Sequence, residues 1–460
     1  MKSAFRKFSL VLALALLVAS FPMAHSTKAA EKITVTWFVG LGTGTDKEQI
    51  AIQNKIVEKF NASQSEIDLK LNIAASNQVA PDTLSTLIAA GTAPDLVGPV
   101  GFDGSNQFAG QWLDLTSLIA KTKYNLTQFP DNLVGLYKEG DALVGIPFAV
   151  FPGILYYNKD LFDEAGLAYP PTKVGAKYKL NGKEVDWDYE TVAQVAKLLT
   201  VDSAGNDATN AKFDPSKTAQ FGFVHQYGGA RSEFSTFGGS PIIDAKTGKV
   251  SIPDNWRAEA KWLYNGIWKD HFIPSATYSA SDLLKPSEFA SGKVAMARTM
   301  LWYTCCVSDL KAKWDIGVQP SYKGTTFAPA DADTFRIVKT TKNPDATFKV
   351  LSYLLGDGAL DLLTVYGAYP ARPDLQDASI KAKAEKYPSV QNWSIVAPAL
   401  SYATVPHHES FYPNYSKGQQ RLSDFRTLLY GDTGKSIDVD KELDKLQADL
   451  QTIIDAAPKK

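Results

Sequence analysis

The order of apolar patterns in the first part of the chain constrains its fold more than any other feature. Residues 33–39 alternate apolar with other side chains, and residues 67–73 do the same, as strands with one buried face do. An apolar stripe with helical spacing over 52–60 separates these runs, and a second helical pattern over 83–90 leads to a short apolar run over 95–100. Strand, helix, strand, helix and strand within about seventy residues predict a parallel, doubly wound α/β sheet.

The loops that follow these strands are the first candidates for a binding site, because such sheets bind ligands beyond the carboxyl ends of their strands. These loops are residues 40–45, 74–79 and 101–106. The glycines of the first loop do not fit a dinucleotide site, since the third comes one residue early for G-x-G-x-x-G and no ribose-binding acid ends the second strand. We interpret this loop as backbone that either passes close to a ligand, with Gly42 and Thr43 as contacts, or packs tightly.

The first thirty residues have the build of a secretory signal peptide. Lys2, Arg6 and Lys7 precede an apolar run over 10–19, and small residues surround a plausible cleavage position over 24–30. The run is short for a bilayer span, and no cysteine follows it to carry a lipid anchor. We therefore expect an exported protein, periplasmic or extracellular, without a lipoprotein cysteine. A buried hydrophobic helix and an uncleaved signal anchor are the alternatives.

Charge and composition exclude several classes of partner. Without residues 1–30 the chain has 44 basic and 49 acidic residues, a net charge of −5, which is no electrostatic footprint for nucleic acid or an anionic membrane. The adjacent pair His407 and His408 has only His225 and His271 as histidine partners after the signal segment, and Glu409 is not followed by the second histidine of H-E-x-x-H. We expect no metal site and no cofactor.

The remainder of the chain continues the α/β pattern. Residues 145–158 are apolar and uncharged with two prolines, which suits a strand passing between two domains. Residues 174–188 indicate a turn-rich insertion with a small hairpin. Further helices are predicted over residues 189–199, 253–268, 344–355 and 437–454.

Residues 136–171 (LYKEGDALVGIPFAVFPGILYYNKDLFDEAGLAYPP) resemble the extracellular solute-binding proteins of family 1, the sugar-capturing subunits of ABC importers. In that family a "dGk.ygiP" segment leads into a hinge strand and then into "YNkdlFdeaGl..PP". Further similarities follow in the family's order at residues 86–95 (TLIAAGTAPD), 220–229, 289–302 (FASGKVAMARTMLW) and 367–372.

The resemblance implies a two-lobed periplasmic-binding-protein fold. Each lobe would be a doubly wound α/β sheet, the lobes would be joined by crossing hinge strands, and the solute would lie in the cleft. After a signal peptide at 1–30, the first lobe would comprise residues 31–148 and 317–370. The second lobe would comprise residues 149–316 and 371–460.

The resemblance also implies a set of ligand contacts. Trp302 follows the Ala-Met pair of one motif, Tyr227 follows a second-lobe strand, Asp103 follows the third strand, Phe151 lies on the hinge strand, and Tyr412 matches a late cleft aromatic more loosely. A sugar has an apolar face and a rim of hydroxyls, so it requires a flat aromatic side chain and fixed hydrogen-bond partners. The predicted contacts are completed by Gln226, Tyr303 and Arg372.

Each of these residues also has a purely structural interpretation. Trp302 and Phe151 would suit a core, Asp103 would suit a turn, and Arg372 would suit a surface salt bridge. The function that the resemblance implies is capture of a sugar or oligosaccharide by a monomer that delivers it to the membrane permease of an ABC importer. The alternatives are an exported carbohydrate-active enzyme, for which no strand-end pair of carboxylates emerges, and a binding protein that feeds a sensor.

Cys305 and Cys306 are the only cysteines of the chain. In an oxidising compartment they can stay free, link to another molecule or bond to each other. A bond between neighbours strains the peptide, because consecutive Cα atoms lie closer than an ordinary disulfide prefers. We predict a vicinal disulfide at the cleft rim beside Trp302, with a pair of reduced, buried thiols as the alternative.

Overall fold

The structure is a computed structural model, which describes residues 31–238, 241–244, 246–404 and 412–457. The predicted signal peptide at 1–30 and the residues His407, His408 and Glu409 lie outside these ranges. Within the ranges described, no helix combines the length and the apolar character that crossing a membrane requires.

The main sheet has the strand order β2–β1–β3–β15–β6–β11–β10–β9. In addition, β12 and β16 pair with β6, and β17 pairs with β15. Its strands are β1 (Ile33–Val39), β2 (Ile67–Ile73), β3 (Leu96–Val100), β6 (Ile146–Asn158), β9 (Val201–Asp202), β10 (Thr218–His225), β11 (Val294–Met300), β12 (Trp314–Gly317), β15 (Ala328–Ile337), β16 (Tyr369–Pro370) and β17 (Ala403–Thr404). Three short hairpins pair β4 (Lys138–Glu139) with β5 (Ala142–Leu143), β7 (Lys177–Leu180) with β8 (Lys183–Asp186), and β13 (Ser321–Tyr322) with β14 (Thr325–Thr326).

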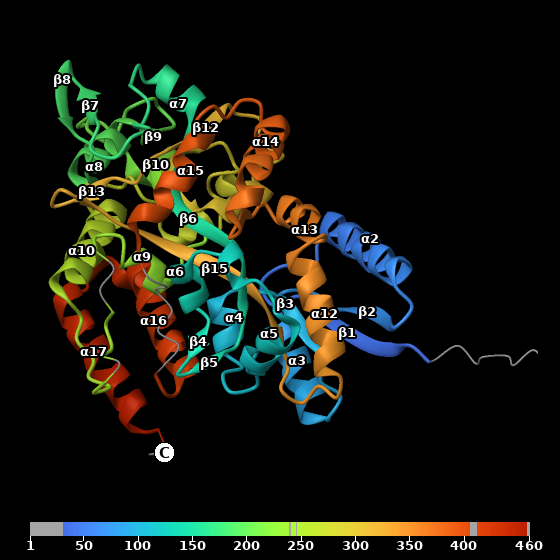
Figure 1. Ribbon diagram of the computed structural model, residues 1–460. Helices are drawn as coiled ribbons and strands as arrows, with labels where there is room; N and C mark the ends of the chain where they lie inside the picture. Colours follow the sequence, from blue (N-terminus) through green and yellow to red (C-terminus); the bar gives the residue numbers. More distant parts are fainter. Residues whose placement is uncertain (1–30, 239–240, 245, 405–411, 458–460) are drawn as a thin grey trace, which may run out of the picture.

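Helices cover the sheet in both halves of the molecule (Figure 1). They are α2 (Lys47–Ser63), α3 (Ala80–Ala89), α4 (Phe102–Asn106), α5 (Thr116–Thr122), α6 (Asp131–Gly135), α7 (Lys159–Glu164), α8 (Tyr189–Leu198), α9 (Ala230–Glu233), α10 (Asp254–Trp268), α11 (Ala276–Ser279), α12 (Pro344–Leu355), α13 (Ala359–Val365), α14 (Gln376–Lys386), α15 (Val396–Ala399), α16 (Tyr415–Tyr430) and α17 (Val439–Asp455).

The predicted strand–helix–strand–helix–strand unit is confirmed. β1 pairs in parallel with β2 on one side and with β3 on the other, so the chain reverses its direction of winding between β1 and β3. Val35, Trp37 and Val39 face the core beneath α2, whereas Phe38 faces the core beneath α3. Helices on both faces of the parallel strands make this half doubly wound.

β6 is the structural link between the two halves, as its apolar sequence predicted. All thirteen of its residues are buried. The first part of β6 pairs antiparallel with β15, and the part that begins at Gly153 pairs antiparallel with β11 and β12. One strand therefore belongs to both halves, and the two sheets expected from the sequence are continuous through it.

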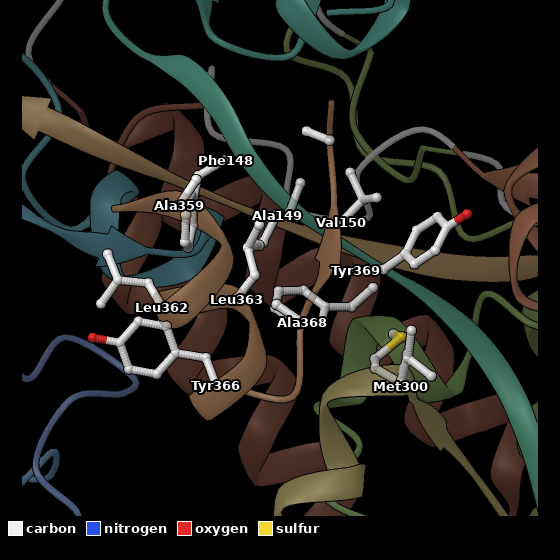
Figure 2. Packing of buried hydrophobic residues seen from close by; sticks show 14 of the residues in the cluster. Phe148, Ala149, Val150, Met300, Ala359, Leu362, Leu363, Tyr366, Ala368 and Tyr369 are labelled. Carbon is white, nitrogen blue, oxygen red and sulfur yellow. The ribbon is translucent and has the colours of Figure 1, made fainter. Parts of the chain in front are cut away.

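The packing around β6 continues from one half into the other. Figure 2 shows side chains of α13, including Leu362 and Leu363, in one cluster with Ala149 and Val150 of β6. Met300, at the end of β11, belongs to the same hydrophobic core. This continuous core therefore holds the crossing strands in place between the two halves.

We call the half containing β1–β3, α2, α3, α12 and α13 the first lobe, and the half containing β9–β11, α8, α10, α16 and α17 the second lobe. In Figure 1 these groups lie on opposite sides of the crossing strands β6 and β15. The predicted hairpin is confirmed as β7–β8, and the four later helices are confirmed as α8, α10, α12 and α17. The lobe boundaries drawn in the sequence remain a prediction.

Candidate functional site

Two cavities meet between the lobes. The first has a volume of about 530 Å³ and the second about 400 Å³. Asp103, Trp302 and Asp331 line both of them. The two cavities therefore form one cleft, with an aromatic side chain and two carboxylates at its junction.

The first cavity lies where the parallel strands of the first lobe change winding direction. Gly42 and Thr43 come from the loop after β1, and Asp103 comes from α4, which begins directly after β3. Loops at the carboxyl ends of neighbouring strands that wind in opposite directions leave a crevice between them. Gly42 has a φ of +104°, and a side chain there would be strained, so the loop places its backbone at the cavity wall.

The first cavity is rich in carboxylates. Asp46, Asp103, Asp331 and Asp333 line it, and no Lys or Arg is among the described residues that do. Asp331 and Asp333 share one face of β15 because side chains two residues apart on a strand point the same way. The register between β15 and β6 shifts at Asp333, and such irregularities turn side chains towards a site.

Burial and the Asp331 charge raise the pKa of Asp333 to about 7. The Asp333 carboxyl thus exists in both protonation states near neutral pH. In its protonated form it can donate a hydrogen bond as well as accept one. Asp331 accepts a hydrogen bond from the Trp302 indole N–H at 3.1 Å, which fixes the ring next to the acidic wall.

An aromatic platform stands at the junction of the cavities. The rings of Trp302 and Tyr227 are stacked, with centroids 6.2 Å apart and an angle of 17° between their planes. Tyr303 supports both rings edge-on and is itself held by a 2.8 Å hydrogen bond to Ser287. Tyr227 is 55% exposed and has a φ of 53°. A large exposed ring in a left-handed backbone conformation is a common feature of ligand sites.

The second cavity has a different electrostatic character. Arg231 of α9, Arg298 of β11 and Arg426 of α16 line it, together with Gln226 at the end of β10. Glu233, which is fully buried, pairs with Arg426 at 2.8 Å. Gln226 is held by hydrogen bonds to Glu288 and to the backbone N–H of Phe289. The cleft is therefore acidic at one end and basic at the other.

A hydrogen bond across the cleft connects the lobes. The Tyr415 hydroxyl at the start of α16 donates to Asp103 Oδ1 at 3.1 Å. Tyr415 belongs to the core of the second lobe, whereas Asp103 lies on α4 of the first. The lobes thus touch beside the cavities that they enclose.

The matched family completes this description. Residues 55–392 match the sequence profile described as "Bacterial extracellular solute-binding protein". This range includes most of the chain and the three residues that line both cavities, Asp103, Trp302 and Asp331. The chain belongs to this family.

Similar proteins of known name cover different shares of the chain. A glycerol-3-phosphate-binding periplasmic protein of Brucella abortus is 27% identical over 168 residues, 35% of this chain and 37% of that protein. A multiple sugar-binding protein of Streptococcus mutans is 26% identical over 150 residues, 32% of this chain and 33% of that protein. The chain therefore spans only about a third of the length of these curated relatives.

Solved structures match nearly the whole chain and confirm the two-lobed fold. An ABC substrate-binding protein of Listeria monocytogenes in complex with cycloalternan has a TM-score of 0.72 at 20% identity, over 92% of this chain and 99% of that one. Maltose-bound MalE3 of T. maritima has a TM-score of 0.65 at 19% identity, over 92% of this chain and 100% of that one.

The structure brings most of the predicted contacts of this solute-binding protein together. Those that line the cleft are Gly42, Thr43, Asp103, Phe151, Gln226, Tyr227 and Trp302. Tyr303 lies behind the platform, where it is buried. Their role as ligand contacts stays a prediction.

Two predicted contacts lie elsewhere. Tyr412 is buried in the second-lobe core, packed against Tyr415 and Gly418, so its ring fills space between helices instead of facing the cleft. Arg372 makes a salt bridge with Asp374 at 2.6 Å and donates to the Leu355 carbonyl, which agrees with the alternative interpretation of this residue as part of a surface salt bridge.

Cys305 and Cys306 line the first cavity, beside Trp302, as predicted. In the structure they are free thiols with their sulfur atoms 2.6 Å apart, and the buried alternative does not hold because both are exposed. Hydrogen bonding between the two raises the pKa of the Cys305 thiol and lowers that of Cys306. The vicinal disulfide stays a prediction for the protein in an oxidising compartment.

The Asp331–Asp333 pair and the three arginines were not predicted from the sequence. Aspartates at alternate positions of a strand are a recognisable signal, because they place two carboxylates on one face. The arginines carry no such local signal, since β11, α9 and α16 supply one each from distant parts of the chain.

Proposed function

We propose that the protein captures a sugar or oligosaccharide between its lobes and delivers it to the membrane permease of an ABC importer. The observation that carries this proposal is the junction of the two cavities, where the stacked rings of Trp302 and Tyr227 adjoin the carboxylates of Asp103 and Asp331. Stacked rings suit the apolar face of a sugar, and carboxylates accept hydrogen bonds from its hydroxyls.

The relatives support the same ligand chemistry. Proteins of similar fold hold cycloalternan or maltose, and the curated relatives are named for sugar or glycerol phosphate binding. All of these ligands are rich in hydroxyl groups. The family and the similar structures are binding proteins, so we propose binding without catalysis by an exported monomer.

Closure around the ligand would use the crossing strands as a hinge. β6 and β15 connect the lobes, and the register shift at Asp333 lies between them. Bending there would change the distance between Tyr227 and the arginines of the second lobe and the loop after β1, and the Tyr415–Asp103 hydrogen bond already links the lobes beside the cleft.

A thermal-shift panel of neutral mono-, di- and oligosaccharides tests the proposal, followed by calorimetry of the best sugar. We expect at least one saccharide to raise the melting temperature and to bind the Trp302→Ala variant about tenfold more weakly. Tyr412→Phe is the matched control, because this ring lies in the core outside the cleft and should leave affinity unchanged. If peptides or polyamines stabilise the protein and no saccharide does, the ligand class is wrong.

A further inference from the structure

The Arg298 guanidinium is the least satisfied charged group of the cleft. Arg298 is 1% exposed, and only its Nη1 has a hydrogen-bond partner, the Ser232 hydroxyl at 3.1 Å. Among the residues that the structure describes, Nε and Nη2 have no acceptor and the guanidinium makes no ion pair. Buried N–H donors without an acceptor are costly, so an acceptor that enters the second cavity would be strongly favoured.

Arginine side chains gather at this end of the cleft. Arg231 and Arg426 line the same cavity, and Glu233 pairs with Arg426. Glu259 does not accept a hydrogen bond from Arg298, because one of its oxygens accepts from Thr236 and the other from the Phe237 backbone at 3.0 Å.

Burial raises the pKa of Glu259 well above its ordinary value. Burial also lowers the pKa of Arg298, although the nearby acidic groups Glu259, Glu233 and Asp331 favour its charged form.

The acidic first cavity makes this arrangement directional. Asp46 and Asp333 line only the first cavity, and Asp103 and Asp331 stand at the junction with the second. An anionic group is repelled by the carboxylates and attracted by the guanidiniums, whereas a neutral hydroxylated group can bind beside carboxylates or beside guanidiniums. A ligand with a neutral part and an anionic part would bind in one orientation.

We propose that the second cavity is a subsite for an anionic substituent of the bound sugar, a phosphate, sulfate or carboxylate, with Arg298 as its main contact. This proposal rests on the proposed function. The substituent would accept the free N–H groups of Arg298 while the sugar ring lies against Trp302 and Tyr227 and its neutral portion occupies the first cavity. Guanidinium donors match the oxygens of such anions in a planar, two-point geometry.

Calorimetry with matched ligand pairs tests the subsite. The pairs are D-glucose against D-glucose 6-phosphate and D-glucuronate, and trehalose against trehalose 6-phosphate, all at one ionic strength, with inorganic phosphate as a separate arm. We expect an anionic probe to bind at least about tenfold more tightly than its neutral partner. Arg298→Met should abolish most of this preference, and Arg298→Lys should retain part of it.

The controls separate the possible failures. Arg421→Met removes an arginine of α16 that pairs with Asp449 outside the cavities, and it should keep the full preference. Circular dichroism and melting curves verify that each variant folds. Equal affinities within the pairs would overturn the anion subsite and leave sugar binding intact. Inorganic phosphate binding as tightly as the sugar phosphates would show a free-anion site and also overturn it. Binding of no saccharide, neutral or anionic, would reject the proposed function itself.

Discussion

Because the pKa of Asp333 is raised, ionisation of this carboxyl should make the folded protein less stable as the pH rises. Asp333 lies at the wall of the first cavity, and its pKa of about 7 contrasts with an ordinary value of 3.8. At pH 5 the folded protein therefore holds a proton on this carboxyl that the unfolded chain has lost. Because the folded state binds more protons, its stability falls as the pH rises from about 4 to about 7 and is constant above that interval.

The size of the effect follows from the same values. A change from 3.8 to about 7 corresponds to about 4 kcal/mol over the full interval, and about two thirds of this falls between pH 5 and pH 8. Asp333 is partly exposed, so solvent screens part of the effect, and we expect a loss of about 1–2 kcal/mol between these pH values. Asp333→Asn keeps the shape of the side chain without an ionisable group, and it should remove this loss.

Urea unfolding followed by tryptophan fluorescence, at intervals from pH 5 to pH 8, measures the difference between the variant and the wild type. Only the difference matters, because buried Lys383 also has a pKa lowered to about 7. Asp374→Asn is the control. Its salt bridge with Arg372 lowers the pKa of Asp374, so this group is ionised throughout the interval and its variant should run parallel to the wild type. An Asp333→Asn profile parallel to the wild type would refute the reasoning.

Three further experiments have expected outcomes. Tyr227→Ala should weaken binding of the best saccharide about tenfold by calorimetry without lowering the melting temperature, because the ring is exposed; unchanged affinity would remove it from the site. Alkylation of the denatured protein without reductant should add no mass at Cys305 and Cys306, because a vicinal disulfide leaves no free thiol. Uptake of two alkyl groups would contradict the disulfide. If the disulfide is present, the Cys305→Ser/Cys306→Ser variant should bind sugar more weakly than the wild type. Gly222→Ala should cost about 3 kcal/mol in urea unfolding, because a Cβ there collides with the backbone of α8, whereas Gly135→Ala, which has open space, should be neutral.

The elements that could be predicted from the sequence are those set by local periodicity. The alternation over 33–39 and 67–73 corresponds residue for residue to β1 and β2, because successive side chains of a strand point to opposite faces of the sheet. The exact start of the helix between these strands was not predicted correctly. Thr45 and Glu48 have capping-box spacing, but the structure begins α2 after Asp46, with Gln49 as the capping partner.

What the sequence could not predict is what depends on contacts between distant segments. The uniform burial of β6 was visible in its composition, but its sharing between both halves of the sheet depends on β11 and β15, which come much later in the chain. The same holds for Arg298, whose neighbours come from α9 and α16. Tyr412 was placed in the cleft on a loose alignment, and a tyrosine near a helix start suits a core equally well.

The sharing of β6 also determines when the protein can fold as it is synthesised. β6 is complete at residue 158, yet its partners in β15 lie about 180 residues further along the chain. Until they emerge from the ribosome, the first part of β6 lacks its β15 partner, although β11 and β12 are already available to the part that begins at Gly153. A nascent chain that ends before residue 328 thus exposes an apolar strand edge, and such edges promote aggregation. Completion of the sheet therefore waits for the last third of the chain, and a truncation before β15 removes a partner strand of both β3 and β6.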